Sequence, residues 1–413
     1  MSLEHIVIAG AGQAGYQVAA SLRQDGYAGT LTLVGDEPGV PYQRPPLSKA
    51  YLLGKVGRDA LRFRTPEFYA QQRIERIEAH ITSIDRMERA VLLDDGRRLP
   101  YDHLVLAMGA RNRVPALPGI ELDGVLGIRT LADADALAPR LATARHAVVI
   151  GAGFIGLEFA AVAVARGLQV EVLELGSRPM ARAITPAMSA LFAAAHAGWG
   201  VNIRYGTGVG RLLGEDGRVS GVETSSGEVL AADLVVYGIG VLPNVELAQG
   251  AGLRVQNGVA VDAHLRTSDD AISAIGDLVA FPSTWTQAPV RLESVQNAVD
   301  QARALAARLT GKSDAPYMAL PWFWTDQGDL KLQIAGLSDG HDETVVLGSA
   351  DAHQMSVLCY RAGRLVAVES VNRPADHMAA RKILSRPGLP TAAQARELGF
   401  ELKAWELATR PAT

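Results

Sequence analysis

The apolar residues of the chain form runs and periodic stripes that predict alternating strands and helices. Residues 5–22 begin with an apolar run, pass through a glycine-rich turn and continue with apolar residues at helical spacing. Residues 146–163 repeat this order, and second strands are predicted at 30–34 and 169–173. Two repeats of this kind predict two Rossmann-like α/β units, each with a parallel sheet.

The rest of the chain has a different pattern. Strand-like segments at 101–111 and 232–244 close the two units, and residues 294–309 have the spacing of a helix. From about residue 320 the apolar residues alternate in short stretches separated by Gly and Asp turns. We expect a separate α+β C-terminal domain there, with strands at 331–334, 355–360 and 365–371.

The composition is that of a globular protein with several domains. The chain has 413 residues, 48% of them apolar and 20% charged, and a domain usually takes roughly 100–200 residues. A net charge of −4 argues against a nucleic-acid partner, which favours basic proteins. Two apolar stretches, 6–22 and 147–165, are broken by glycines and are expected to be buried rather than in a membrane.

The cysteine and histidine content excludes several kinds of site. Cys359 is the sole cysteine, so no disulfide framework or cysteine-rich metal site can form within one chain. This fits a reducing, cytoplasmic setting. The nine histidines show no ligand spacing, and we therefore expect no metal.

The first glycine-rich turn matches the dinucleotide fingerprint G-x-G-x-x-G. Gly10 permits the tight turn, Gly12 lets the backbone approach a pyrophosphate, and Gly15 allows close packing of helix on strand. The acid that normally follows the second strand is replaced by Gly35. Asp36 and Glu37 come next, and either could hold the adenosine ribose, with Asp36 favoured.

The second turn repeats the fingerprint and adds the acid. Its glycines are Gly151, Gly153 and Gly156, and Glu174 ends the following strand. A carboxylate there accepts from a ribose 2′-hydroxyl and repels a 2′-phosphate, which favours NAD over NADP. The preference is softened by two nearby cations, Arg178 and Arg182.

Seven motifs, in order, give the chain a family resemblance. They are VGDEPGVPYQRPPLSKAYL, LVLAMGAR, GAGFIGLE, GIGVLPN, AIGD, RLESVQNA and PWFWTDQG. The chain resembles the FAD-dependent, NADH-using ferredoxin reductases of bacterial oxygenase systems from its first residue to about Arg373. One departure is Met108, where the family usually has Thr, so a hydroxyl contact there is lost.

The resemblance implies a glutathione-reductase-like fold with FAD in the first Rossmann unit and NADH in the second. It also implies an FAD-binding domain in two parts, an NAD-binding domain and a C-terminal α+β domain. The expected boundaries are 1–112 and 239–318 for FAD, 113–238 for NAD, and 319–413 for the C-terminal domain.

Site residues follow from the same resemblance. Lys49 should lie near flavin N5 with Glu158 beside it as an ion pair, and a buried cation there would stabilise an anionic flavin. Asp277 should bind the ribityl hydroxyls, and Val295 should offer its N–H to the flavin at a helix start. Further expected cofactor contacts are Ala14, Arg44, Ile81, Arg129, Ile155, Arg182 and Gly240.

Electron exit is expected at the flavin edge, where Trp322 and Trp324 resemble an aromatic pair of the family. Related disulfide reductases carry cysteines beside the flavin, but residues 38–54 contain none. Electrons should therefore pass directly to an external acceptor. The resemblance implies that this acceptor is a 2Fe-2S ferredoxin serving a haem monooxygenase or a ring-hydroxylating dioxygenase. Basic docking candidates are Arg62, Arg64, Arg73, Lys312 and the Arg381–Lys382 pair.

The sequence is also compatible with two alternative functions. One is a redox-sensing flavoprotein like apoptosis-inducing factor, which would hold a long-lived complex of reduced flavin and NAD. The other is a reductase of another acceptor, such as rubredoxin or monodehydroascorbate. For the protein itself we expect a monomer or a weak homodimer.

Overall fold

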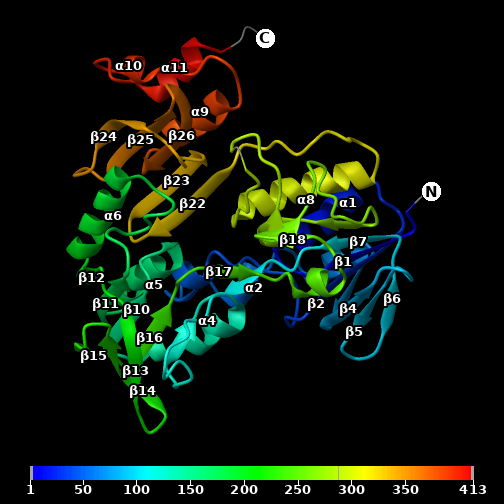
Figure 1. Ribbon diagram of the computed structural model, residues 1–413, viewed down its shortest axis with the longest axis horizontal. Coiled ribbons are helices and arrows are strands. Elements are labelled where there is room, and N and C mark those ends of the chain that lie inside the picture. Colours follow the sequence, from blue (N-terminus) through cyan, green and yellow to red (C-terminus); the bar gives the residue numbers. More distant parts are fainter. Residues whose placement is uncertain (1–2, 287, 411–413) are drawn as a thin grey trace. The chain divides into compact units, whose positions relative to one another are not determined.

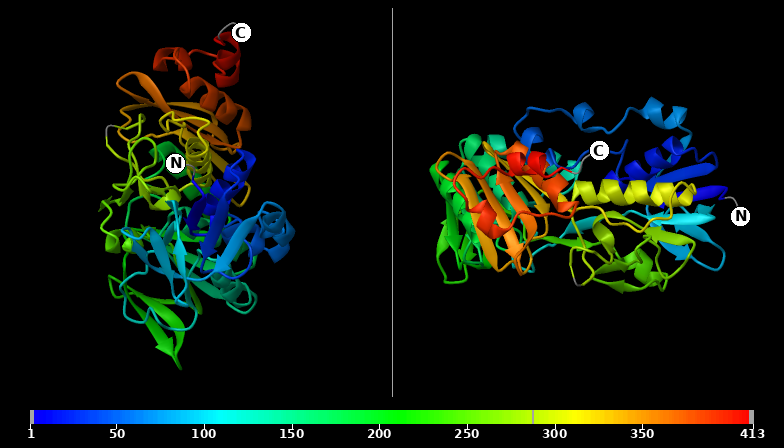
Figure 2. Two further views of the ribbon diagram at one scale, coloured as in Figure 1. Left: turned by 90° about the vertical axis from the view of Figure 1, so that its right-hand side faces the viewer. Right: turned by 90° about the horizontal axis from the view of Figure 1, so that it is seen from above.

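A parallel sheet with buried strands lies at the centre of the first dinucleotide unit. Its order is β20 (Ile272–Ala274), β7 (His103–Leu106), β1 (His5–Ala9), β2 (Thr30–Gly35) and β3 (Ile74–Glu78). β1 is apolar on both faces because both faces are covered. The helices α1 (Gln13–Gln24) and α8 (Val295–Leu309) pack side by side on the sheet (Figures 1 and 2).

The second dinucleotide unit repeats this architecture. Its parallel sheet has the order β12 (Val201–Tyr205), β11 (Gln169–Glu174), β10 (His146–Ile150), β16 (Leu234–Tyr237) and β9 (Val125–Gly127). The helix α5 (Phe154–Ala165) follows β10, and α6 (Pro186–Gly198) precedes β12. The equivalence of β1 with β10 and of α1 with α5 is what the repeated sequence pattern predicts.

The C-terminal region forms an antiparallel sheet, so the predicted change from parallel α/β to α+β is confirmed. The order is β22 (Trp322–Gln327), β23 (Leu330–Gly336), β26 (Arg364–Val371), β25 (Gln354–Arg361) and β24 (Glu343–Ser349). The helices α9 (Pro374–Leu384) and α10 (Ala392–Ala395) pack against it, and α11 (Leu402–Ala408) packs against α9 (Figure 1).

Smaller elements make up the rest of the fold, and most of their strands form further small sheets. The segment between β2 and α2 contains η1 (Leu47–Tyr51), a single π-helical turn, and such turns often occur at functional sites. The other elements are α2 (Arg58–Leu61), α3 (Pro66–Gln71), β4 (Ile81–Asp85), β5 (Ala90–Leu93), β6 (Arg98–Pro100), β8 (Ala110–Asn112), α4 (Leu131–Leu137), η2 (Arg140–Ala142), β13 (Val209–Glu215), β14 (Arg218–Thr224), β15 (Val229–Ala231), β17 (Val241–Pro243), α7 (Glu246–Gly250), β18 (Val255–Gln256), β19 (Gly258–Ala260), η3 (Gly276–Leu278) and β21 (Val279–Ala280).

The computed structural model describes residues 3–286 and 288–410, and these fold into two units. The first unit combines residues 3–43, 58–111 and 242–321, and the second combines 44–57, 112–241 and 322–410. The segment 44–57 thus groups with the sheet that contains β10. The expected boundaries of the FAD, NAD and C-terminal domains stay a prediction. Over the described residues, no helix is long and apolar enough to cross a membrane.

The second fingerprint shows why its glycines differ in tolerance to substitution. A Cβ on Gly156 would lie 2.2 Å from the carbonyl oxygen of Gly151, whereas one on Gly153 would meet only the Gly238 oxygen, at 3.5 Å. The first distance is a severe clash and the second an ordinary contact. Gly156 is therefore required for packing, and Gly153 leaves space above the turn.

We predict opposite outcomes for Gly156→Ala and Gly153→Ala. The first should lower the melting temperature, because α5 must move away from β10 to relieve the clash. The second should keep the wild-type melting temperature but weaken dinucleotide binding, since its methyl group fills the space of a pyrophosphate. Thermal melting and titration with NAD⁺ measure the two effects. Equal melting temperatures for both variants would show that Gly156 is not required for packing.

Candidate functional site

A buried ion pair forms the centre of the site in the second unit. Lys49 Nζ lies 2.9 Å from Glu158 Oε1, and the side chains are 16% and 7% exposed. Glu158 also accepts hydrogen bonds from Ser48 Oγ and from Thr325 Oγ1, both at 2.5 Å. The carboxylate is thus satisfied by one cation and two hydroxyl groups, as a buried charge requires.

Three separate segments supply these groups. Ser48 and Lys49 come from the π-helical turn η1, Glu158 from α5 and Thr325 from β22. The family resemblance predicts Lys49 beside Glu158, but it does not identify Ser48 and Thr325 as partners. Both lie inside motifs of the family resemblance, RPPLSK and PWFWTDQG, but no spacing in the sequence pairs either of them with Glu158.

A second polar side chain of β22, Gln327, extends the hydrogen bonds of Thr325 to α6. Gln327 Nε2 donates to Thr325 Oγ1 at 3.4 Å, and Gln327 Oε1 lies 2.8 Å from His196 Nε2. Burial lowers the pKa of His196 and the Gln327 hydrogen bond opposes the shift, so the neutral ring is favoured. Phe323 packs on Phe154 of α5, with ring centroids 4.6 Å apart.

Trp322 and Trp324 lie together on one face of β22, and Thr325 lies on the other, because side chains alternate along a strand. The ring centroids of the two tryptophans are 5.5 Å apart. Arg381 of α9 lies over Trp322, 4.5 Å from its centroid, and His377 lies 5.5 Å from the same ring. The two tryptophans therefore form a pair, on the other side of the strand from Glu158. Their role in electron exit stays a prediction.

The first fingerprint forms a cradle that fits a dinucleotide. Gly10 has a φ of +107°, and a Cβ on Gly15 would lie 1.8 Å from the Gly10 oxygen, whereas one on Gly12 would meet nothing within 4 Å. No side chain caps the start of α1. Its first N–H groups are therefore available to phosphate oxygens.

Other predicted FAD residues gather near this cradle. The Ala14 methyl group lies 3.1 Å from where a Cβ on Gly276 would stand, next to Asp277. Val295 is the first residue of α8, whose N-cap Ser294 accepts from Asn297 N. Ile81, by contrast, packs in the buried core of the first unit. These contacts do not test the predicted roles, which stay predictions.

Gly35 stands at the position of the missing acid for a steric reason. A Cβ there would lie 2.5 Å from the Cβ of Ala11, so no side chain fits without a backbone shift. Asp36 is 68% exposed and lies 3.6 Å from His80 Nδ1. Glu37 accepts a hydrogen bond from Tyr42. The choice between these two acids for the ribose stays a prediction.

The second fingerprint has the same form, and two backbone N–H groups bond its acidic residue, Glu174. Gly151 has a φ of +100°, and α5, with Ile155 in its first turn, starts at Gly153 without a side-chain cap. Glu174 accepts from Ala152 N at 2.8 Å and from Gly176 N at 2.7 Å. The backbone thus fixes this carboxylate at the edge of the cradle.

The predicted arginines take different positions. Arg182 Nη2 lies 3.8 Å from where a Cβ on Gly240 would stand, which brings these two predicted residues together. Arg178 donates to the carbonyl oxygens of its own loop. Arg44 Nη1 donates to the Arg129 carbonyl oxygen at 2.8 Å, so these two also lie together in the second unit.

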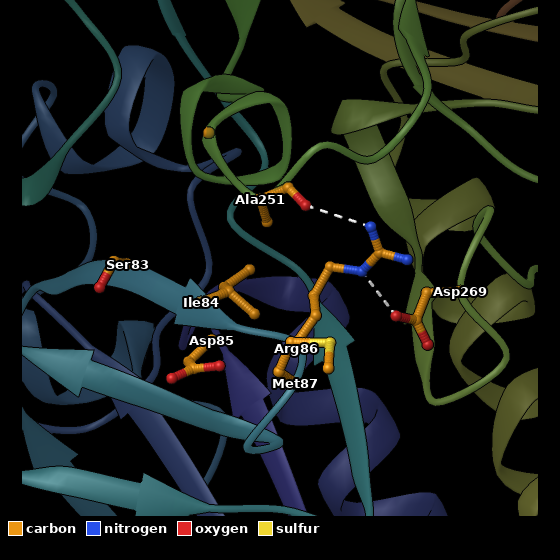
Figure 3. Close-up of a pocket in the computed structure, with 8 residues that line it drawn as sticks. Ser83, Ile84, Asp85, Arg86, Met87, Ala251 and Asp269 are labelled. Atoms are coloured by element: carbon orange, nitrogen blue, oxygen red, sulfur yellow. Dashed lines mark hydrogen bonds and ion pairs between the residues drawn. The ribbon is translucent and has the colours of Figure 1, made fainter.

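A hollow in the first unit lies apart from these residues. It has a volume of about 640 Å³, and its described lining residues, which include Ser83, Arg86, Met87 and Asp269, contain none of the predicted site residues. Arg86 donates to Asp269 Oδ2 at 2.7 Å and to the Ala251 oxygen at 3.3 Å (Figure 3). Within residues 3–286 and 288–410, no cluster of His, Cys, Asp and Glu could hold a metal ion.

Comparison with known proteins identifies the family. Residues 4–302 match the model of the pyridine nucleotide-disulphide oxidoreductases, and residues 322–405 match a reductase C-terminal model. The chain belongs to the pyridine nucleotide-disulphide oxidoreductases. Family membership implies FAD and NAD(H) as cofactors, and both glycine cradles fit a dinucleotide.

Two curated relatives are similar to this chain over most of its length. Rhodocoxin reductase of Rhodococcus erythropolis is 53% identical over 399 residues, which cover 96% of this chain and 93% of the relative. A rubredoxin-NAD(+) reductase of Pseudomonas putida is 40% identical over 370 residues, which cover 89% of this chain and 96% of that relative. The predicted resemblance to ferredoxin reductases of oxygenase systems is confirmed.

Solved structures agree on the fold. The ferredoxin reductase for the CYP199A2 system of Rhodopseudomonas palustris has a TM-score of 0.95 and 51% identity, covering 98% of this chain and all of that chain (100%). The reductase in a covalent putidaredoxin reductase–putidaredoxin complex has a TM-score of 0.95 and 39% identity, covering 99% of both chains. The predicted fold, two Rossmann-like domains and an α+β C-terminal domain, is confirmed.

Removing the Thr325 hydroxyl tests the geometry around Glu158. Thr325→Val should destabilise the protein by about 1–3 kcal/mol, because a buried carboxylate loses a hydrogen-bond donor. It should also slow the reduction of bound FAD by NADH severalfold, since Glu158 holds Lys49. Unfolding in denaturant and the flavin absorbance after rapid mixing measure the two effects. Thr325→Ser, which keeps the hydroxyl, is the control, and wild-type behaviour of Thr325→Val would contradict the assignment.

Proposed function

We propose that the protein is an FAD-dependent NADH:ferredoxin reductase whose 2Fe-2S ferredoxin serves a haem monooxygenase or a ring-hydroxylating dioxygenase. The buried Lys49–Glu158 pair, in a chain with two dinucleotide cradles, is the observation that carries the proposal. The relatives named as ferredoxin and rhodocoxin reductases support it, as does the solved complex with putidaredoxin.

The residues divide into two binding sets. Gly10, Gly12, Gly15, Asp277 and Val295 would hold FAD, which when bound accepts a hydride from NADH and releases electrons singly. The proposed NADH set consists of Gly151, Gly153, Ile155, Gly156, Glu174, Arg182 and Gly240.

Lys49 would contribute a positive charge that favours negative charge on a bound ring system. Because Glu158 and its two hydroxyl donors hold the ammonium group in place, little reorganisation is needed during the reaction. Lys49 and Glu158 together are the residues we assign to the hydride step.

The single thiol is unsuited to redox exchange. Cys359 is fully buried in β25, and burial raises the pKa of its thiol. The segment 38–54 contains no cysteine that could receive electrons. Direct transfer to an external carrier is therefore the proposed route, and the same cysteine usage supports a cytoplasmic location.

The nucleotide preference is proposed to rest on Glu174 and Arg178. The carboxylate of Glu174 is fixed by two backbone N–H groups and would repel a 2′-phosphate. Arg178 donates to Ile184 O, Ala181 O and Ser189 Oγ, so this cation is already engaged within its own loop. Both features favour NADH over NADPH.

The identity of the protein that accepts the electrons is proposed separately from the nucleotide preference. A rubredoxin is the main alternative, because a rubredoxin-NAD(+) reductase is among the relatives. Several of the proposed docking cations already have partners: Arg62 lies 2.8 Å from Asp59 and Lys312 lies 2.8 Å from Asp25. Such exposed pairs are weak and can exchange with an acidic partner protein.

Glu174→Ala tests the assignment of the two cofactors. It should raise the KM for NADH about tenfold, the effect of losing roughly 1.4 kcal/mol of binding, and leave the FAD content unchanged. Steady-state kinetics with NADH and NADPH measure this. Glu171→Ala is a matched control on the same strand, because Glu171 pairs with Arg204 instead. Loss of FAD from Glu174→Ala would mean that the two sites have been exchanged.

Comparison of purified acceptors tests the function itself. We expect the NADH-reduced protein to reduce a 2Fe-2S ferredoxin faster than a rubredoxin, and the rate to fall as salt rises, because opposite charges steer the encounter. Cytochrome c reduction through each acceptor measures this. Faster transfer to rubredoxin would favour the alternative. A long-lived complex with NAD and no transfer to either acceptor would favour a redox sensor.

A further inference from the structure

A buried carboxylate of the C-terminal sheet caps a helix of the NAD-binding unit. Glu369 of β26 is fully buried, and its oxygens lie 2.9 and 3.1 Å from Thr185 N and 2.7 Å from Thr185 Oγ1. Thr185 is the N-cap of α6 and accepts from Met188 N at 3.3 Å. An acid at this position also interacts favourably with the helix dipole.

The segment 175–184 connects Glu174, beside the second cradle, with Thr185 at the start of α6. Met180 N donates to the Ala152 oxygen of the fingerprint at 2.9 Å. Arg178 joins the segment to α6 through Ser189 Oγ at 2.6 Å. The segment is therefore fixed at one end by the fingerprint and at the other by Glu369.

We propose that Glu369 is a positioning residue for NADH: it anchors the segment 175–184, and with it Arg182, against the second cradle. This rests on the proposed function, in which that cradle binds NADH. Arg182 is exposed and lies beside Gly240, where it can reach a bound nucleotide. The C-terminal domain thereby gains a role in nucleotide affinity, in addition to its contact with Glu158.

The surroundings of Glu369 decide its charge. Its neighbours across the sheet, Ile334 and Val357, are apolar. Burial raises the pKa of Glu369 to about 7, while hydrogen bonds from Thr185 and the charge on Arg178 oppose the shift. The polar groups facing it are thus Thr185, Arg178 and the Ser338 hydroxyl, with Cys359 nearby on β25.

Among the described residues, two other titratable groups of the neighbouring elements have hydrogen-bond partners of their own, and a third has none. His196 of α6 bonds Gln327. Asp376 of α9 accepts from Ser356 and Arg373. His377 of α9 packs against Trp322 on the other side of the sheet, and neither of its ring nitrogens has a hydrogen-bond partner among the described residues. Burial lowers the pKa of His377 to about 4, so its ring is neutral near pH 7. Glu369 is therefore the group of this cluster expected to change charge near neutral pH.

Two pH effects of opposite sign follow. The ionised carboxylate accepts stronger hydrogen bonds from Thr185, so NADH binding should tighten as the pH rises from 6 to 8.5. A carboxyl group whose folded pKa is raised stabilises the fold below its unfolded pKa, and that contribution is lost as the pH rises through about 7. Affinity and thermal stability should therefore move in opposite directions over this range.

Glu369→Gln in the FAD-loaded protein tests the proposal. At pH 8.5 we expect the KM for NADH to rise about three- to tenfold with kcat within a factor of two, because a charge-assisted anchor is lost. With ferricyanide as acceptor, the wild-type KM should fall between pH 6 and 8.5 and that of the variant should stay flat. The melting temperature of the variant relative to wild type should rise over the same range.

Matched variants separate the possible outcomes. Glu343→Gln is the control on the same sheet, since Glu343 pairs with Arg396 at its far edge. If Glu369→Gln does not fold, Thr185→Val should raise the KM for NADH and Thr185→Ser should restore it. A wild-type KM in Glu369→Gln, or in Thr185→Val, with the wild-type pH profile overturns the proposal. An unmodified protein that does not oxidise NADH would instead overturn the proposed function.

Discussion

A carboxylate that folding removes from water must receive its hydrogen bonds from the protein, and Glu158 shows how far this requirement reaches. Unpaired, such a charge would cost several kcal/mol. Its three partners are Ser48 and Lys49, both from the π-helical turn η1, and Thr325 from a strand of the C-terminal sheet. The position of each of these segments is thereby tied to one oxygen pair on α5.

The same requirement explains the polar contacts on the face of the C-terminal sheet that packs against α5 and α6. Thr325 bonds Glu158, Gln327 bonds His196, and Glu369 bonds Thr185, so three polar contacts join this sheet to α5 and α6. Apolar contacts such as Phe323 on Phe154 supply attraction but tolerate sliding. Hydrogen bonds to buried partners tolerate little sliding, because a shift leaves polar groups unsatisfied. The polar contacts therefore define one register of the sheet on the helices.

The features predicted from sequence are those that depend on local spacing. A fingerprint such as Gly151 to Gly156 determines a turn and a helix start within a few residues, and its repetition predicts both sheets. The alternating pattern after residue 320 predicts the antiparallel sheet in the same way. Lys49 beside Glu158 came from family resemblance, since no spacing rule relates residues so far apart. Ser48, Thr325 and Glu369 were missed because their partners are chosen by tertiary packing.

Gly35 shows how packing can override a motif. The fingerprint places an acid after the second strand, and Glu174 occupies that place in the second unit. In the first unit the approach of Ala11 leaves no room for a Cβ. A carboxylate that binds the ribose must then come from a neighbouring position. Asp36 is exposed, whereas Glu37 accepts a hydrogen bond from Tyr42, so the two side chains differ in their freedom to move. Glu37 already has a hydroxyl partner, whereas Asp36, among the described residues, faces the weakly paired His80. Asp36 can therefore reorient at lower cost, and its assignment to the ribose stays a prediction.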